Sequence, residues 1–268
     1  KAVELINQYK VMHKPFFLAI GFVRPHVPLV APRKYFAPYA FDEMVLPPKI
    51  PGDWDDIPTN SVNRRTSEHL QMDIYQQKKL IRAYYASVSF MDAMTGKVME
   101  ALEQSGQRDN TIVIFTSDHG YHLGEHDLWS KVSVHEESAR VPLIISVPGK
   151  QPVVCDSLVE LLDLYPTVSK LCGLKIPGNL QGHDISPILD DPKVKVRDAV
   201  LCSALYREQR WALMNYGKSG ELYDMEKDPK QYTNLFSKPE YADLVEELKK
   251  KMKAKRDEIS KNDLVKEQ

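Results

Sequence analysis

Residues 111–131 read TIVIFTSDHGYHLGEHDLWSK, and this stretch decides the expected fold and the expected site. Its first part, 111–116, is a short apolar run rich in β-branched side chains, which predicts a fully buried strand of an α/β sheet. Asp118, His119 and Gly120 follow almost at once. Open α/β sheets bind their ligands just beyond the carboxyl ends of their strands. We therefore expect a binding site at Asp118 and His119.

The loop after this strand adds further groups that bind metals or anions. His122, Glu125 and His126 come within a few residues, and Lys131 closes the stretch. The alternative is a simple turn in which Asp118 caps the next segment. So many titratable groups within a dozen positions favour a site over a turn.

A second apolar run ends near another histidine. Residues 16–22 predict a buried strand, and the segment 24–28, RPHVP, follows it. The two prolines around His26 fix the backbone and aim the imidazole from the end of the strand. From these residues alone, a rigid turn with an incidental histidine remains an equal alternative.

The remaining patterns predict the architecture. A helix over 73–105, a strand over 142–148 and a helix over 158–171 alternate with the 111–116 strand, which indicates a mainly parallel sheet. The long irregular stretch 31–72 is expected to form a loop over the mouth of the site.

The last quarter of the chain predicts a separate small unit. We expect a catalytic α/β domain over 1–195 and an α+β subdomain over 196–268. The subdomain should contain short strands and a charged helix, at 199–204, 211–216, 221–224 and 239–259.

Composition narrows the class of protein. The 268 residues carry a net charge of −1, with 43% hydrophobic and 27% charged residues, as is ordinary for a globular protein. The charge balance argues against a nucleic-acid partner. The sequence has neither an 18-residue apolar run nor a visible signal peptide. It opens with KAVELINQYK, which resembles the middle of a helix, so we expect further residues upstream.

Three segments carry a resemblance to a known family. They are FTSDHGYHLGEHDLWSK with EESARVPLIISVPG (115–149), PFFLAIGFVRPHVP (15–28) and ELYDMEKDPKQYTNL (221–235). They resemble the C-terminal portion of type I, formylglycine-dependent sulfatases of the alkaline-phosphatase-like superfamily. Iduronate-2-sulfatases, enzymes of glycosaminoglycan degradation, and their bacterial relatives are the nearest match. The resemblance implies the alkaline-phosphatase-like sandwich, with its N-terminal strands missing from this chain.

The resemblance also implies roles for individual residues. Asp118 and His119 match metal ligands, the metal being Ca²⁺, although calcium favours oxygen donors over imidazole. Lys131 matches the lysine that bridges the sulfate and the formylglycine, and His26 matches the histidine near the ester oxygen. Three further residues would line the substrate mouth: Tyr121, His122 and His135. The implied substrate is a sulfated sugar or polysaccharide, and the implied compartment is periplasmic, secreted or lysosomal.

The sequence departs from the family at the nucleophile. It contains neither C-x-P-S-R nor S-x-P-S-R, and it lacks the family's early Asp-Asp metal pair. We therefore expect half an active site, inactive without an N-terminal segment that supplies the formylglycine.

Three rival hypotheses stay open. A zinc hydrolase could use His119, His122 and His126, although HEES at 135–138 is not the H-E-x-x-H motif. A phosphomonoester or phosphodiester hydrolase of the same superfamily is the second rival. The third is a non-catalytic pseudoenzyme module.

Overall fold

The apolar run forms a strand, but its sheet is not the predicted one. The structure, a computed structural model, describes residues 1–12, 14–61, 65–129 and 131–261. In it β1, Val113–Thr116, pairs antiparallel with β2, Leu143–Ser146. A parallel neighbour requires a crossover, usually a helix packed along the sheet. Among the described residues of 117–142, the only α-helix is the four-residue α3, Glu136–Ala139, and the chain returns in the opposite direction. The predicted parallel sheet is therefore wrong for the described residues.

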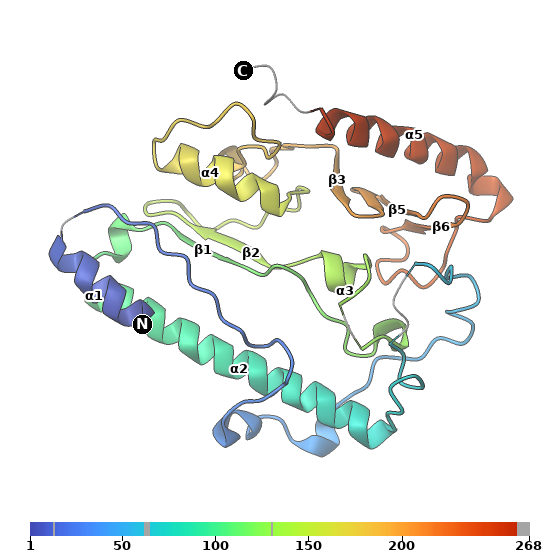
Figure 1. The fold of residues 1–268 in the computed structure, drawn as a ribbon, viewed down its shortest axis with the longest axis horizontal. Helices are drawn as coiled ribbons and strands as arrows, with labels where there is room; N and C mark the ends of the chain where they lie inside the picture. Colours follow the sequence, from blue (N-terminus) through green and yellow to red (C-terminus); the bar gives the residue numbers. More distant parts are fainter. Residues whose placement is uncertain (13, 62–64, 130, 262–268) are drawn as a thin grey trace.

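The second predicted strand, 16–22, is absent from the described ladders. The segment instead runs extended between α2 and β1 (Figure 1). Leu18 packs against the buried cluster of Ile6, Ala101 and Leu102, whereas Phe17 is 79% exposed. A strand requires hydrogen bonds from a neighbour, and the described part of the chain provides none here.

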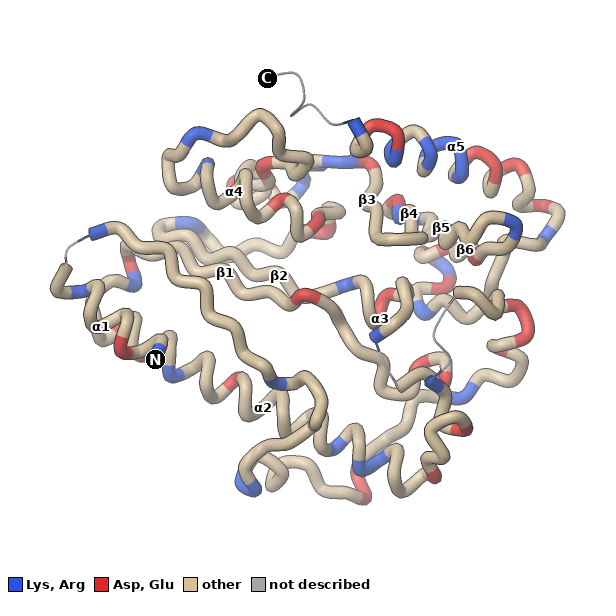
Figure 2. Tube along the Cα trace, in the orientation of Figure 1, with Lys and Arg blue, Asp and Glu red and all other residues tan. Residues whose placement is uncertain are grey.

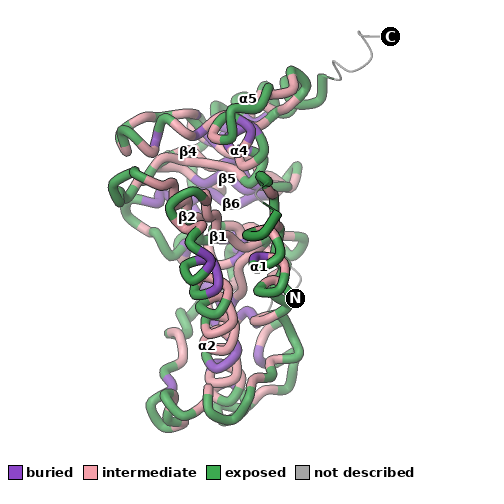
Figure 3. The backbone as a smooth tube through the Cα atoms, turned by 90° about the vertical axis from the view of Figure 1, so that its left-hand side faces the viewer, coloured by how far each residue is buried: buried purple, intermediate pink, exposed green. Residues whose placement is uncertain are grey.

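The expectation that β1 and β2 are fully buried is also wrong. All four residues of β1 are half-buried, and Ile144 of β2 is 60% exposed. Figure 3 shows the pair among half-buried and exposed segments, with α2 on one side and α4 on the other. Because the described sheet has only two strands, much of its apolar surface faces solvent.

The long helix was predicted correctly. α2 spans Ile74–Gln104 and begins at a capping box, in which Asp73 accepts from the Gln76 backbone and Gln76 returns the contact. Gly106 follows the C-cap of α2, and its φ of +73° is a left-handed conformation that glycine adopts readily after a helix. α1, Ala2–Met12, lies against its far end, where Ile6 packs on the 101–102 pair.

The last quarter of the chain forms an antiparallel meander. Its four strands lie in the order β3-β4-β5-β6, and the 217–220 turn joins the last two as predicted. The bounds are Ala199–Cys202, Leu205–Glu208, Trp211–Asn215 and Gly220–Asp224. β4 was missed because its sequence, LYRE, has no apolar run.

This meander has two apolar faces, and both are covered. α5, Ala242–Ile259, packs Leu248 and Met252 on one face, against Leu213 and Leu222. Val134 and α3 partly cover the other face. The meander therefore lies directly against the segment that follows Lys131. The proposed boundary at 195/196 remains a prediction.

The other elements are short. α4, Leu164–Leu171, begins directly after a 3-10 turn, and Pro166 lies in its first turn rather than breaking it. The 3-10 turns are Arg33–Phe36, Phe41–Glu43, Arg108–Asn110, Glu125–Asp127, Leu161–Asp163, Ser186–Leu189 and Pro239–Tyr241.

Charges of both signs are interspersed over the molecule. Figure 2 shows Lys and Arg alternating with Asp and Glu, most densely along α5. Within α5, Lys251 contacts Glu247 at 2.8 Å, an i,i+4 ion pair on the face of the helix that was predicted to be charged. None of the helices that the structure describes has the length and apolarity to cross a membrane.

Candidate active site

Three of the predicted site residues meet at one point. The Lys131 Nζ lies 2.7 Å from the His119 Nε2 and 3.2 Å from the His26 Nε2. The two imidazole rings are 6.4 Å apart, centre to centre, so the ammonium lies between them. His26 lies more than 90 positions from both His119 and Lys131 in the sequence, so its contact with Lys131 is a property of the fold.

Backbone contacts fix both imidazoles. The Nδ1 of His26 lies 2.8 Å from the carbonyl of Val27, and the Nδ1 of His119 lies 2.7 Å from the carbonyl of Gly120. A carbonyl only accepts, so each Nδ1 carries a proton and donates it. Each Nε2 faces the Lys131 Nζ and can accept a hydrogen bond from it. The result is an ammonium held between two imidazoles, an arrangement that can bind an anion.

A close backbone approach fixes the loop that carries His119. The Gly120 N–H donates to the carbonyl of Ser138 at 2.9 Å. A Cβ at position 120 would lie 2.0 Å from the carbonyl oxygen of Glu137. Only glycine fits this contact, which joins the site to α3.

Asp118 lies beside this cluster and points outward. Its side chain is 88% exposed, and its Oδ2 is 3.9 Å from the His119 Nε2. The ranges 1–12, 14–61, 65–129 and 131–261 contain no group of three or more His, Cys, Asp or Glu side chains that could hold a metal ion. Calcium takes six to eight oxygen ligands. Asp118 and His119 alone do not fit that requirement, so their role as metal ligands remains a prediction.

The orientation and burial of three histidines test the zinc hydrolase hypothesis. His119 points its Nε2 at Lys131, while His122 and His126 are buried elsewhere, at 1% and 2% exposure. His119 therefore does not share a metal position with His122 and His126, and the zinc hydrolase is not supported.

The three residues predicted to contact the substrate are half-buried or buried. Tyr121 is half-buried, stacks on Tyr84 at 5.6 Å and donates to the carbonyl of Trp129. Its role remains a prediction. His122 and His135 are 1% and 0% exposed, which removes them from any surface that a substrate reaches. The prediction that these two histidines line the mouth is not supported.

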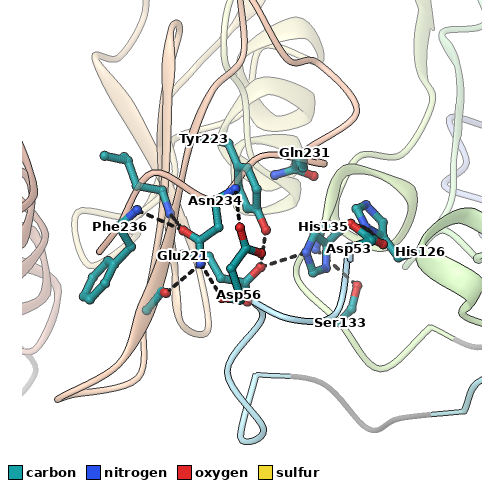
Figure 4. Close-up of polar contacts among 12 residues, drawn as sticks. Asp53, Asp56, His126, Ser133, His135, Glu221, Tyr223, Gln231, Asn234 and Phe236 are labelled. Carbon is teal, nitrogen blue, oxygen red and sulfur yellow. Dashed lines mark hydrogen bonds and ion pairs between the residues drawn. The ribbon is translucent and has the colours of Figure 1, made fainter. Parts of the chain in front are cut away.

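His122 and His135 instead belong to a buried cluster with His126. The His126–His135 rings lie 4.8 Å apart, and His122 is 6.3 Å from His126 and 6.1 Å from His135. Figure 4 shows His126 beside Asp53, and His135 directed at Glu221. The Nδ1 of His126 is 3.0 Å from an Asp53 oxygen, and the Nε2 of His135 is 3.0 Å from a Glu221 oxygen.

Burial and pairing set the charges of this cluster. Burial lowers the pKa of His126, but the hydrogen bond and charge of Asp53 outweigh it, so the net pKa is raised. Burial raises the pKa of Glu221, but the contact with His135 outweighs it, and the net pKa is lowered. His122 has no carboxylate partner: burial first, then its two neighbouring histidines, lower its pKa to about 3. At neutral pH, His122 is therefore uncharged.

Sequence reasoning missed both carboxylates of this cluster. Glu221 lies in a strand whose five residues are all buried, and an inward carboxylate there signals a buried partner. ELYD was predicted as a short strand and noted in the family resemblance, with no role for its glutamate. Asp53 lies in the irregular 31–72 stretch, where no pattern separates a buried aspartate from a solvated one.

Comparison with known proteins identifies the family. Residues 1–174 match the Sulfatase family profile, and residues 124–258 match the family described as N-sulphoglucosamine sulphohydrolase, C-terminal. The chain is 30% identical over 274 residues to the iduronate 2-sulfatase of Mus musculus, a match that covers 87% of this chain and 46% of that protein. The chain spans about half the length of the curated relatives it matches.

Solved structures show the same fold. The phosphonate monoester hydrolase from Silicibacter pomeroyi matches with a TM-score of 0.79 at 23% identity, over 96% of this chain and 60% of that one. A protein solved in complex with its substrate D-glucosamine-2-N,6-O-disulfate matches with a TM-score of 0.72 at 22% identity, over 98% of this chain and 70% of that one. These neighbours define an alkaline-phosphatase-like fold. Together with the profile match, they establish that the chain belongs to the sulfatase family, as the resemblance predicted.

Proposed function

We propose that this chain contributes the sulfate-binding half of an active site that hydrolyses sulfate esters. The observation that carries the proposal is the position of the Lys131 ammonium between the imidazoles of His26 and His119. Two of its N–H groups can face the imidazoles, which leaves a third for an incoming oxygen. A compact ammonium is well suited to a tetrahedral anion.

The residues support a division of labour. Lys131 would neutralise charge on the non-bridging sulfate oxygens as the S–O bond breaks. The His26 Nε2 lies 3.2 Å from the Lys131 Nζ, and in the protonated form of His26 the proton on that nitrogen would pass to the leaving alcohol oxygen, while Lys131 keeps its own protons and its charge. His119 would hold the ammonium in place from the other side.

Calcium and formylglycine, which the family resemblance implies, are not assigned a step. The described donor set does not fit calcium, and the sequence has no formylglycine motif. In the proposal, an upstream segment of the same enzyme supplies the nucleophile. Exposed apolar side chains support a further packing partner, because patches of this kind mark interaction surfaces. They include Phe17, Val23, Ile144 and Val154.

The proposed substrate class is a sulfated sugar. The printed names of two similar proteins, an iduronate 2-sulfatase and a protein bound to a disulfated glucosamine, support this class. A cavity of about 380 Å³ lies against the loop that precedes Lys131, but His26, His119 and Lys131 do not line it, so it is assigned no role in substrate binding. Leu123 and Glu125, from the loop of Lys131, line it together with Tyr85 and Tyr232.

A phosphorus ester is the second candidate substrate. The observation in its favour is the fold of the phosphonate monoester hydrolase, which this chain matches closely. Lys131 would hold a phosphonate oxygen as readily as a sulfate oxygen, so the local geometry alone does not separate the two classes.

A substrate panel decides between the two. The full-length gene product that contains this chain should be assayed with a sulfated monosaccharide, an aryl sulfate, a phosphate monoester and a phosphonate monoester. We expect kcat/KM to be higher for the sulfate esters by about tenfold or more, equivalent to roughly 1.4 kcal/mol of transition-state binding. Faster release of phosphorus-based products would replace the proposal with the second candidate.

A further inference from the structure

The segment that carries Lys131 is anchored on both sides by buried contacts between a histidine and a carboxylate. His126 lies five residues before Lys131 and contacts Asp53, with side-chain exposures of 0% and 5%. His135 lies four residues after it and contacts Glu221, and both of these side chains are fully buried. Lys131 itself is half-buried, and its neighbour Val132 is 54% exposed. The partly exposed segment that carries Lys131 is therefore held on both sides by polar contacts between buried side chains.

The anchor after Lys131 has the more demanding geometry. The Glu221 oxygen that contacts His135 also accepts from the Tyr223 hydroxyl at 2.5 Å. Glu221 and Tyr223 both lie in β6, which pairs along its length with β5. The carboxylate therefore stands on a rigid strand, and its two donors fix its orientation.

Other contacts also hold this side of the segment. Ser133 Oγ lies 2.8 Å from the Nε2 of His122, Val134 packs against the meander, and the Glu136 N–H donates to Gln231. Before Lys131, the buried Trp129 packs with Met44 and Ile81. Among the polar contacts after Lys131, the His135–Glu221 contact joins two fully buried side chains, so the position of Lys131 should depend on it.

We propose that Glu221, acting through His135, is a positioning residue that fixes Lys131 against the sulfate, with Asp53 and His126 as a second anchor. The proposal rests on the proposed function of Lys131. Neither Glu221 nor Asp53 touches the substrate. Their effect is on where the ammonium lies, and a shift of about 1 Å at a reacting group can cost about 10²-fold in rate.

A double-mutant cycle tests the proposal in the full-length gene product that contains this chain. Glu221→Gln keeps the shape of the side chain and removes its charge. We expect kcat for an aryl sulfate to fall by about 10- to 10²-fold, with KM changed less than about threefold. Combined with Lys131→Ala, the substitution should cause almost no further loss, because the residue that it positions is already gone.

Two results would overturn the proposal. One is a folded Glu221→Gln variant whose kcat stays within about threefold of wild type. The other is a double variant that is slower than Lys131→Ala by the full factor of Glu221→Gln, since independent effects multiply. Glu226→Gln is the matched control: Glu226 follows β6 closely, its side chain is 65% exposed, and its loss should leave kcat unchanged. If Glu221→Gln does not fold, Tyr223→Phe removes one hydrogen bond to the same carboxylate, and the same criteria apply.

Hydrogen exchange separates this proposal from the proposed function. If Lys131→Ala retains full activity, the function assigned to Lys131 is wrong. The anchoring by Glu221 is then tested by the exchange rates of backbone amides. Amides of residues 131–135 should then exchange about tenfold faster in Glu221→Gln than in wild type. Unchanged exchange in that segment would contradict the anchoring itself.

Discussion

Replacing Lys131 with alanine should slow sulfate-ester hydrolysis by about 10²–10³-fold in kcat, the usual cost of one preorganised charge donor, roughly 3–4 kcal/mol. The ammonium lies 2.7 Å from His119 and 3.2 Å from His26, so its loss also leaves both Nε2 atoms without their donor. Lys131→Arg should recover only part of the rate, because a planar guanidinium does not reproduce a point charge.

The measurement is steady-state kinetics on an aryl sulfate with the full-length gene product that contains this chain. Lys193→Ala is a suitable control, because Lys193 is an exposed lysine of the loop before β3. Its loss should change stability by less than about 0.5 kcal/mol and leave the rate alone. A Lys131→Ala rate within a few-fold of wild type would remove Lys131 from the site.

Acid should destabilise the folded chain through His122. Burial and the nearby His135 and His126 lower the pKa of His122 to about 3 in the folded state, whereas an unfolded histidine titrates near its ordinary value of 6.5. Between these values the unfolded chain binds the additional proton, so the free energy of unfolding falls as the pH falls. The contribution is fully present above about pH 6.5 and shrinks by about 1.4 kcal/mol per pH unit below it.

Denaturant unfolding between pH 7 and pH 4 measures this slope. His122→Gln stays neutral and can keep the contact with Ser133, so its free energy of unfolding should depend less steeply on pH than wild type. His69→Gln is the control, because His69 lies in an exposed loop. Equal slopes for wild type and His122→Gln would contradict the assignment.

The His126–Asp53 pair acts in the opposite direction in the same titration. The net pKa of His126 is raised in the folded state. Its contribution is therefore present below the unfolded value near 6.5 and is lost as the pH rises through the folded pKa. His122 therefore lowers the free energy of unfolding at acidic pH, whereas His126 raises it. Of the two histidines, only His122 should on substitution make the free energy of unfolding less dependent on pH below about 6.5.

The sequence predicts local structure well where short-range signals decide it. The capping box at Asp73 and Gln76 and the glycine at 106 mark both ends of α2. The 217–220 turn marks the β5–β6 hairpin. In each case a few neighbouring residues fix the backbone, and no distant partner is needed.

The sheet could not be predicted, because strand direction depends on distant partners. The runs 16–22 and 113–116 have similar apolar character, yet only the second forms a strand among the described residues. Direction depends on how the chain returns, and the site loop between β1 and β2 gave no sign of returning antiparallel.

The site residues, too, were predicted only in part. His26, His119 and Lys131 were expected together, and the structure places them within hydrogen-bonding distance. His122 and His135 have the same residue type and lie in the same loop, but they turn inward to buried partners. The sequence does not contain that distinction, since Glu221, the partner of His135, lies 86 positions away.

The most direct test of the central claim is the position of a bound sulfate ion. A crystal structure of the full-length gene product that contains this chain, soaked with inorganic sulfate, should place a sulfate oxygen about 2.7–3.2 Å from the Lys131 Nζ. The His26 imidazole should lie on the same side of the sulfate ion as the Lys131 ammonium. The account is contradicted if sulfate binds elsewhere while Lys131 stays between the two imidazoles with no anion beside it.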